Sequence, residues 1–407
     1  MYDLLQGLRI VEGSAFVAAP LGGMALGQLG ADVIRFDALE GGLDYRRWPV
    51  TKNGESLYWA GLNKGKRSFR VDIQSPRGRE LVQALITAPG PEGGIFLTNL
   101  PARGWLGYEM LSTLRADLIL LNVLGSRTGT PQVDYTVNAS VGFPQVTGPE
   151  DRDGPVNNVL PAWDIATGMA AAVGLLAAER RRARTGEGGL IRLPLLDVAL
   201  WATATLGYVG EVVVNGQDRA RVGNHIYGTF GRDFRTADGS DVMVCLFTAR
   251  NLRGIAEATG LGPAFDRIEA AHGADLNDEA ARWRLREDIA AAIEPWIAVR
   301  PLAAVAKAFD AHGVLWGPYR TFREMAFDAA LVKENPLFER IEQPGMGIWP
   351  VPGTPLDFAG LAREQPRPAP RLGEHTDEIL ASILRLPDAE IGRLHDDGVV
   401  KGPDNLA

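Results

Sequence analysis

Two short runs of β-forming residues, separated by a segment of small residues, constrain the fold of this chain more than any other feature. The runs are LRIVEG (8–13) and ADVIRFD (31–37), and the segment between them contains AAPLGGMALGQLG, which suits a tightly packed helix. A strand, a helix and a second strand within about thirty residues form a β-α-β unit, which joins two parallel strands. The N-terminal region is therefore predicted to be α/β, with a parallel, doubly wound sheet.

Further strands are predicted along the N-terminal half at RSFRVDI (67–73), GIFLTN (94–99) and DLILLNVLG (117–125), with helical patterns between them. In sheets of this kind, the loops at the carboxyl ends of the strands bind ligands. A turn with Gly22 and Gly23 follows the first strand, but the G-x-G-x-x-G pattern of dinucleotide-binding folds is missing there. The sequence therefore argues against a nicotinamide-dependent oxidoreductase.

The second half of the sequence predicts a smaller α+β domain at residues 221–318. Within it, FGRDFRTADGSDVMVCLF predicts two strands around a turn, and helical patterns follow. The whole chain is expected to divide into a large domain begun by 1–200, a linker at 201–220, the small domain, and a return to the large domain at 319–407. A proline-rich span, REQPRPAPRLGEHT, is expected to be an ordered surface segment.

Composition and charge limit the function classes. The chain has 42 Lys and Arg against 50 Asp and Glu, a net charge of −8, and its basic run ERRRAR is local, so no nucleic-acid partner is expected. The single cysteine, Cys245, cannot form a disulfide within the chain, and no Cys or His cluster has zinc-ligand spacing, which fits a reducing cytosol and a protein without metal. Cys245 lies in VMVCLF, an apolar run that predicts a buried strand, where thiols are usually inert. Neither a secretory signal nor a membrane span is expected, because the N-terminus lacks a basic n-region and the apolar windows are short.

One acid, Asp164, stands at the start of an apolar segment that ends in a basic run and glycines. The stretch LPAWDIATGMAAAVGLLAAERRRARTGEGG (160–189) predicts a helix that Asp164 caps and that ends near Gly186. The first interpretation of Asp164 is purely structural, because Asp is a preferred N-cap residue. The second is catalytic: an Asp held ionised by the free N–H groups of a helix start can attack an activated acyl group, and the same groups can stabilise the oxyanion that forms. Local sequence favours the first interpretation and does not show whether a cleft meets the helix.

A series of stretches, in order along nearly the whole chain, matches one known family. The stretches are LQGLRIVEGS, AAP with LGQLGADVIRFD, SLYWAGLNKGKRSFRVDIQSPRGRELV, WDIATGMAAAVGLLAAERRRARTGEGG, LLDV, RVGN, ADG, HGVLWGP and RLGEHTDEIL. Each alone is weak, and their order and spacing together carry the resemblance. On these residues the chain resembles the family III CoA-transferases, the group that includes formyl-CoA transferase and the α-methylacyl-CoA racemases.

The resemblance implies a fold, a nucleophile and a set of CoA contacts. It implies a large Rossmann-like domain built from both chain ends, a smaller α+β domain between them, and two subunits that interlock as a homodimer. The family's nucleophile is an Asp in a D-x-x-T-G context, which here falls on Asp164 to Gly168. No prosthetic group is implied, because coenzyme A is part of the substrate. The implied CoA-binding residues, the last of them a phosphate-binding arginine, are Val17, Ala18, Val71, Asp72, Ile73, Gln74, Asn99, Leu100, Pro101 and Arg103.

Within the family, several phrases resemble the branch that moves CoA between the two carboxyl groups of one dicarboxylic acid, mesaconate (2-methylfumarate). They are EGSAFVAAPLGGM, GGLDYRRWPV, LYWAGLNKGKRS, NLPARGWL, VDYTVN, NVLPAWDIATG and YGTFGRDF. The expected reaction converts 2-methylfumaryl-CoA to 3-methylfumaryl-CoA through an aspartyl anhydride and an aspartyl-CoA thioester. Candidates for contacts with the free carboxylate, each of which can also be a solvated surface residue, are Arg46, Arg47, Lys66, Tyr135 and Asn138.

The resemblance leaves other functions open, and the chain also departs from the family. An intermolecular CoA-transferase is the main alternative. A racemase needs a His well before the nucleophile, and the first His of this chain is His225. A non-catalytic CoA-binding protein would lack the Asp, which is present.

The chain departs from the family at two places. Ala38 stands where transferases often have a basic residue, and no glycine-rich shielding loop occurs between Asp197 and Arg221. The adenine contact and the shielding of the intermediate are therefore expected to differ.

Overall fold

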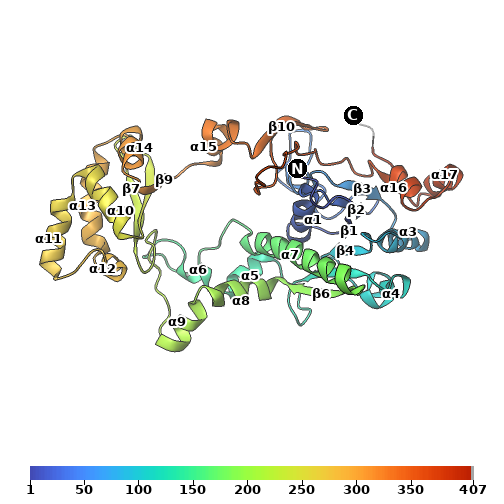
Figure 1. The fold of residues 1–407 in the computed structure, drawn as a ribbon, viewed down its shortest axis with the longest axis horizontal. Helices are drawn as coiled ribbons and strands as arrows, with labels where there is room; N and C mark the ends of the chain where they lie inside the picture. The colour runs from blue at the N-terminus through green and yellow to red at the C-terminus, as the bar shows by residue number, and fades with distance from the viewer. Residues whose placement is uncertain (405–407) are drawn as a thin grey trace. The chain divides into compact units, whose positions relative to one another are not determined.

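A six-stranded parallel sheet organises most of the chain. The computed structural model describes residues 1–404, and the strands lie in the order β3-β2-β1-β4-β5-β6 (Figure 1). Every pairing in this sheet is parallel. The strands are β1 (Arg9–Gly13), β2 (Asp32–Asp37), β3 (Arg67–Arg70), β4 (Ile95–Thr98), β5 (Ile119–Leu124) and β6 (Gly189–Pro194). The predicted doubly wound α/β sheet is confirmed, and β1 to β5 lie within the segments expected from the sequence.

Helices cover both faces of this sheet because its strands are apolar on both sides. Successive strand residues point to opposite faces, so Ile10 packs in one core and Val11 in the other. The first core includes residues of α1 and α7, and the second includes residues of α3, α4, α16 and α17. The helices of this part of the chain are α1 (Ala18–Gln28), α2 (Leu57–Leu62), α3 (Pro76–Thr87), η1 (Gly104–Leu106), α4 (Tyr108–Leu114), α5 (Asp134–Ser140), α7 (Ala162–Thr185), α8 (Leu195–Thr205), η2 (Ala329–Lys333), α16 (Thr376–Ser382) and α17 (Asp388–Asp396).

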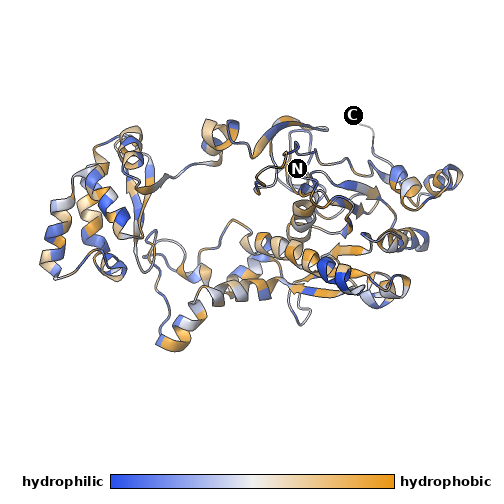
Figure 2. Ribbon diagram, in the orientation of Figure 1, coloured by the Kyte–Doolittle hydropathy of each residue, from blue (hydrophilic) through white to orange (hydrophobic). Residues whose placement is uncertain are grey.

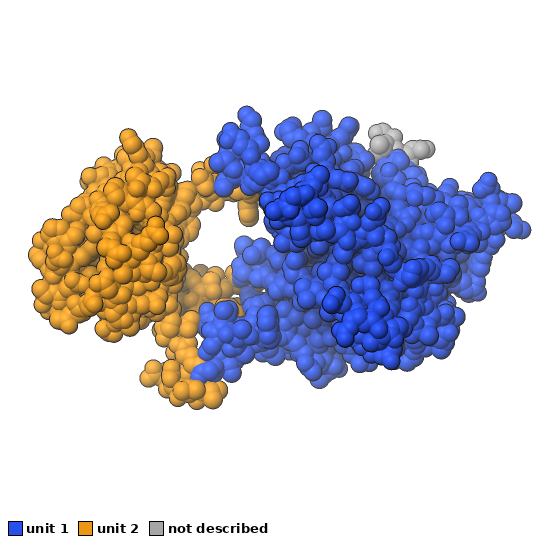
Figure 3. Space-filling model, viewed as in Figure 1, with its two compact units in different colours: residues 1–141, 158–210, 329–407 blue, residues 142–157, 211–328 orange. Residues whose placement is uncertain are grey.

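The chain divides into two compact units, which Figure 3 shows in different colours. The first unit consists of Met1–Val141, Asn158–Gly210 and Ala329–Ala407, so it draws on both ends of the chain. Besides the six-stranded sheet it contains a hairpin of β10 (Phe338–Gln343) and β11 (Gly347–Pro352). The second unit consists of Gly142–Asn157 and Glu211–Asp328.

The second unit has its own core on a three-stranded antiparallel sheet in the order β7-β8-β9. The two strands predicted around the turn at Asp238 are present as β7 and β8. Only alternate residues of β8 are buried, and Cys245 lies on the other, partly exposed face, where burial still raises the pKa of its thiol. The elements of this unit are α6 (Phe143–Val146), β7 (Phe230–Arg235), β8 (Asp241–Leu246), α10 (Ala249–Thr259), α11 (Gly262–His272), α12 (Glu279–Arg284), α13 (Arg286–Ala298), α14 (Leu302–Ala311), β9 (Leu315–Pro318) and α15 (Phe322–Phe327).

Much of the segment expected to be a linker, 201–220, is helical. Helix α8 continues to Thr205, and α9 (Tyr208–Asn215) follows after a short break. Both helices are rich in apolar residues (Figure 2). Such residues favour a helix that packs against another surface over an open linker. Among the described helices no single one is long and apolar enough to cross a membrane, and α8 and α9, bent by 59° to each other, pass that test only as a pair.

Helices α1 and α7 pack at very close range, and glycines make this possible. A Cβ added to Gly168 of α7 would lie 2.7 Å from the carbonyl oxygen of Ala18, and one added to Gly22 of α1 would lie 2.9 Å from the carbonyl oxygen of Gly168. Backbone atoms packed this tightly leave no room for a side chain. Thr167, the neighbour of Gly168, is fully buried. The glycine of the D-x-x-T-G motif therefore brings the first turns of α7 against the start of α1.

Candidate active site

The structure places Asp164 in the first turn of α7 but not at its cap. The N-cap is Pro161, whose side chain makes no capping hydrogen bond, and Asp164 is the third residue of the helix. The prediction that Asp164 caps the helix is therefore wrong: the helix begins earlier, directly after a proline whose fixed φ suits a helix start. The predicted end of the helix is confirmed, because Gly186 has a φ of 73° and its N–H donates to the carbonyl oxygen of Arg182 at 2.7 Å.

A second carboxylate, that of Asp134, caps α7 instead. Asp134 is the first residue of α5 and is only 3 % exposed. Its Oδ2 accepts a hydrogen bond from the N–H of Asp164 at 2.9 Å, and the N–H of Trp163 also donates to this carboxylate. One turn further along α5, the Oδ1 of Asn138 accepts a hydrogen bond from the indole Nε1 of Trp163 at 3.1 Å. Helix α5 thus fixes the start of α7 through two side chains, and the N–H of Asp164 is already used.

Asp164 lines a cavity of about 680 Å³ in the first unit. This volume lies within the range of small-molecule sites. The loops after β1 and β4 contribute Val17, Ala18 and Asn99 to its wall. These two loops flank the point where the strand order reverses, which is where doubly wound sheets bind their ligands. Other polar and aromatic side chains in the lining are Phe16, Arg47, Trp48, Tyr58, Gln132, Asp134 and Tyr135.

The surroundings of Asp164 raise the pKa of its carboxyl to about 7. Loss of hydration on burial is the largest cause, the negative charge of Asp134 adds to it, and the positive charge of Arg47 opposes it. The expectation that the helix start holds Asp164 ionised is therefore wrong, because Asp134 accepts from the N–H groups that would do so. A carboxyl with a pKa near neutrality inside a cavity is typical of a catalytic group.

Arg47 is the cation that acts on Asp164. Its guanidinium packs on two aromatic rings, 5.3 Å from the centroid of Phe16 and 5.3 Å from that of Tyr58. Burial raises the pKa of Tyr58 to about 12, so its phenol is protonated at neutral pH. Among those residues of 1–404 that line the cavity, Arg47 is the one cationic side chain. The site therefore offers one titratable carboxyl pair and one group that can bind an anion.

The loop between β1 and α1 has an unusual conformation at the wall of the cavity. Phe16 has a φ of 66°, in the left-handed region that is costly for an aromatic residue. Its N–H donates to Oδ2 of Asp44 at 3.0 Å. The neighbouring Ala15 exchanges two hydrogen bonds with the side chain of Asn99, at 2.9 and 2.7 Å. Contacts from two sides therefore hold the backbone that leads into Val17.

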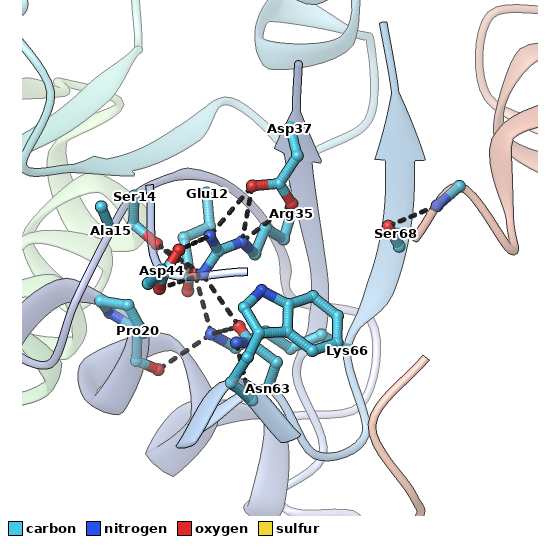
Figure 4. A network of polar contacts seen from close by, with 12 residues as sticks. Glu12, Ser14, Ala15, Pro20, Arg35, Asp37, Asp44, Asn63, Lys66 and Ser68 are labelled. Carbon is cyan, nitrogen blue, oxygen red and sulfur yellow. Dashed lines mark hydrogen bonds and ion pairs between the residues drawn. The ribbon is translucent and has the colours of Figure 1, made fainter. Parts of the chain in front are cut away.

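A buried network of charged side chains supports this loop, as Figure 4 shows. Arg35 is 1 % exposed and pairs with Asp37 at 2.9 Å and with Asp44 at 2.8 Å. The Nζ of Lys66 lies 2.7 Å from Oε1 of Glu12, and burial lowers the pKa of Lys66 to about 8 although Glu12 opposes this. Lys66 is thus bound within the network and does not line the cavity.

The structure brings together some of the predicted substrate contacts and separates others. Arg47 and Tyr135 line the cavity with Asp164, whereas Arg46, Lys66 and Asn138 do not. Arg46 lines a second cavity of about 500 Å³ in the same unit. Asn138 is buried and holds Trp163, as described above. One of the two adjacent arginines therefore faces the acid, and the other does not.

The predicted CoA contacts divide in the same way. Val17, Ala18 and Asn99 reach the cavity. The others follow β3 and β4 outside its lining, and they are Val71, Asp72, Ile73, Gln74, Leu100, Pro101 and Arg103. Val71 is fully buried in the core, so it can offer a ligand only its backbone.

Sequence reasoning missed Asp134, Tyr58 and Phe16 as residues of the site. Asp134 heads a short helix thirty residues before Asp164, and its own surroundings suggest no more than a local cap. Tyr58 follows the N-cap Ser56 of α2 and is flanked by apolar residues, which suits a core position equally well. The left-handed backbone conformation of Phe16 could not be predicted either, because the residue types around it do not indicate a positive φ. Only the packing of distant segments shows what these side chains do.

The fold and the site define an α/β enzyme with a titratable carboxyl at the switch point of its sheet. More closely, the chain belongs to CoA-transferase family III, whose sequence profile matches residues 5–376. The predicted family is thereby confirmed. Within the described part of the chain, no group of three or more His, Cys, Asp or Glu side chains is arranged to hold a metal ion.

Relatives of known name cover all or nearly all of the chain. The 2-methylfumaryl-CoA isomerase of Chloroflexus aurantiacus is 56 % identical over 409 residues, which cover 100 % of both chains. The human succinyl-CoA:glutarate CoA-transferase is 28 % identical and covers 97 % of this chain and 90 % of its own. The crystal structure of a CAIB/BAIF family protein from Brucella suis has a TM-score of 0.77 at 25 % identity and covers 94 % of this chain and 100 % of its own.

We expect Asp164→Asn to stabilise the protein, and to do so more at high pH. The pKa of about 7 in the folded state lies above the ordinary 3.8, so the folded protein loses stability from this group as the pH rises from 3.8 through about 7. The asparagine carries no charge and avoids that loss. The stability gain of the variant over the wild type, measured by urea unfolding, should be larger at pH 8 than at pH 5 by about 1–3 kcal/mol. A gain that does not change with pH would contradict the raised pKa.

Proposed function

We propose that the chain catalyses intramolecular CoA transfer between the two carboxyl groups of mesaconate, converting 2-methylfumaryl-CoA to 3-methylfumaryl-CoA, with Asp164 as the nucleophile. The observation that carries this proposal is the presence, in one cavity, of the Asp164 carboxyl and a single cation, Arg47. Such a cavity fits an acyl group with a thioester at one end and one carboxylate at the other. The 56 % identity over the full length with a protein named 2-methylfumaryl-CoA isomerase supports the same substrate.

In the first half of the reaction, the ionised Asp164 attacks the thioester carbonyl of the substrate. A C–O bond forms, the C–S bond breaks, and CoA leaves as a thiolate from the mixed anhydride of Asp164 and mesaconate. The thiolate then attacks the Asp164 carbonyl of this anhydride. A new C–S bond makes the aspartyl-CoA thioester, and mesaconate is released as a dicarboxylate.

In the second half, the same steps run in reverse on the other carboxyl group. The second carboxylate of mesaconate attacks the aspartyl thioester and forms a new mixed anhydride. The CoA thiolate leaves in this step. The thiolate attacks the mesaconyl carbonyl of that anhydride and releases the Asp164 carboxylate. No proton or electron is gained or lost, and the net change is the position of the thioester.

Each attack on a carbonyl creates an oxyanion that needs N–H donors. The N–H of Asp164 donates to Asp134, which leaves the start of α7 less suited to this task. The start of α1 is the better source, because the first N–H groups of a helix have no partner within it and Val17 and Ala18 line the cavity. In known enzymes, loss of one such donor raises the barrier by about 3 to 4 kcal/mol.

Arg47 and the strand ends place the two ends of the substrate. The guanidinium of Arg47 binds the carboxylate that is not being transferred, and its packing on Phe16 and Tyr58 restricts where it can point. The CoA portion extends from the cavity along the ends of β3 and β4, past residues 71–74 and 99–101. The exposed Arg103 is then available to a phosphate group.

We also propose that two chains form the interlocked homodimer of the family. Helices α8 and α9 and the break between them carry large apolar side chains that are 67 to 82 % exposed, namely Trp201, Leu206, Val213 and Val214. A run of exposed apolar residues of this kind marks a surface that another protein covers. A second copy of the chain is the occupant that the family resemblance implies.

The test of the nucleophile is Asp164→Asn, assayed with mesaconyl-CoA. We expect this variant to fold and to bind CoA, but to turn over at least about a thousandfold more slowly, because no anhydride can form. Hydroxylamine should trap Asp164 of the wild type as a hydroxamate, detected by peptide mass, only when substrate is present. Normal turnover by the variant would reject Asp164 as the nucleophile.

The test of the intramolecular route is turnover of unlabelled mesaconyl-CoA in the presence of isotopically labelled free mesaconate. We expect no label in the product, because the dicarboxylate formed midway stays in the cavity. Mass spectrometry of the product measures this. Label that enters the product in proportion to the added acid would instead show an intermolecular CoA-transferase.

Arg47→Met is expected to reduce kcat/KM for mesaconyl-CoA by about 10- to 100-fold, because the free carboxylate loses its charged partner. Arg46→Met is the matched control, since it removes the same charge from the adjacent residue, which lines the other cavity. Steady-state kinetics of both variants measures the difference. Equal losses in the two variants would contradict the role given to Arg47.

A further inference from the structure

Helix α5 touches the start of α7 through two side chains of different kinds. Asp134 and Asn138 lie one turn apart, and both are buried, at 3 and 5 % exposure. Asp134 binds the N–H groups of Trp163 and Asp164, and Asn138 binds the indole of Trp163. Asparagine or serine would cap a helix as well as aspartate does. Capping of α7 alone therefore does not require a charged side chain at position 134.

We propose that Asp134 is a positioning residue for Asp164, which both holds the start of α7 and keeps a fixed negative charge beside the nucleophile. This inference rests on the proposed function in one respect only, the role of Asp164 as the nucleophile. Its geometry, a buried carboxylate bonded to the backbone of the attacking residue at 2.9 Å, does not depend on the substrate.

The two carboxyl groups share one site but differ in their hydrogen bonds. Burial is the largest influence on both carboxyl groups and raises the pKa of each, but two backbone N–H groups oppose this rise at Asp134, whereas at Asp164 the pKa reaches about 7. Because the rise is large only at Asp164, this is the group of the pair that takes up a proton first as the pH falls. The other groups that face Asp164 are Arg47, which favours its charge, and Tyr58, which is neutral at neutral pH because burial raises its pKa to about 12.

The charge of Asp134 favours acylation of its neighbour. While Asp164 is a carboxylate, the two negative charges repel each other at short range. When Asp164 becomes an anhydride or a thioester it is neutral, and the repulsion disappears as the C–O bond forms. A more basic carboxylate is also a stronger nucleophile, and a pKa of about 7 still leaves part of the Asp164 carboxyl ionised at neutral pH.

The experiment compares Asp134→Asn with Asn138→Ala. The first variant keeps an acceptor for the N–H groups of α7 but removes the charge, and the second removes a contact with the same helix start but no charge. The Asp164 carboxyl is titrated by ¹³C NMR of the aspartate-labelled protein, with its signal assigned from Asp164→Asn. The pH profile of kcat/KM with mesaconyl-CoA is the second readout.

We expect Asp134→Asn to lower the pKa of Asp164, to move the acid limb of the pH profile to lower pH, and to reduce kcat at pH 8 by about three- to tenfold. We expect Asn138→Ala to leave the position of the acid limb unchanged. If Asp134→Asn does not fold, Asp134→Ser provides another uncharged capping residue.

The inference is overturned if the pKa of Asp164 in folded Asp134→Asn or Asp134→Ser equals that of the wild type or is higher. Asp134 would then act only as a cap of α7. Failure of the proposed function is distinguishable from this result. A wild type that does not turn over mesaconyl-CoA would reject the function, while the NMR titration, which needs no substrate, would still decide the effect of Asp134 on its neighbour.

Discussion

The close contact between α7 and α1 is the constraint on which the site depends. Because Gly22 and Gly168 have no side chains, the backbones of the two helices touch, and both helices begin at the same edge of the sheet. Asp164 precedes Gly168 by about one turn, so its carboxyl faces the loop that leads into α1. The glycine of the D-x-x-T-G motif thus positions the acid without contacting a substrate, and a larger residue there would separate the acid from Val17 and Ala18.

Charges buried around this contact oppose stability and favour a defined geometry. Asp134 and Asp164 are two like charges in one small volume, and Arg35 is an ion almost removed from water. Arg35 is tolerated because two carboxylates satisfy it, and one of them, Asp44, also holds the strained backbone of Phe16. Replacing such groups by apolar ones is often neutral or stabilising in other proteins. Their presence at the wall of the cavity fits a site where positioning outweighs stability.

The parts of this protein that follow from local pattern could be predicted, and the parts that arise from distant contacts could not. The strands β1 to β5 are apolar runs bounded by turn residues, and α7 ends at Gly186 because a glycine follows a basic last turn. The first turn of α7 was predicted wrongly because the sequence around a helix start does not show which side chain binds its first N–H groups. A residue at the helix start can do so, and so can a distant one such as Asp134. Strand β6 was missed because it has the exposed Arg192 in its middle and ends in Pro194. Arg46 and Arg47 are equivalent in sequence, and only the path of the loop decides which one reaches Asp164.

The charges in the cavity give a reason why free mesaconate would stay there during the proposed reaction. Midway through the proposed reaction, mesaconate carries two carboxylates, but the lining offers it one cation, Arg47. One carboxylate can pair with Arg47 while the other remains next to the aspartyl thioester, and the two carboxylates differ only by a methyl group on the carbon chain between them. Exchanging their places restores the same pairing, so rotation of the acid within the cavity changes little electrostatic energy. The thioester on Asp164 has meanwhile removed one of the two negative charges, those of Asp164 and Asp134, that repel the acid. A site with a single cation and a neutralised nucleophile therefore favours return of the same molecule over its replacement.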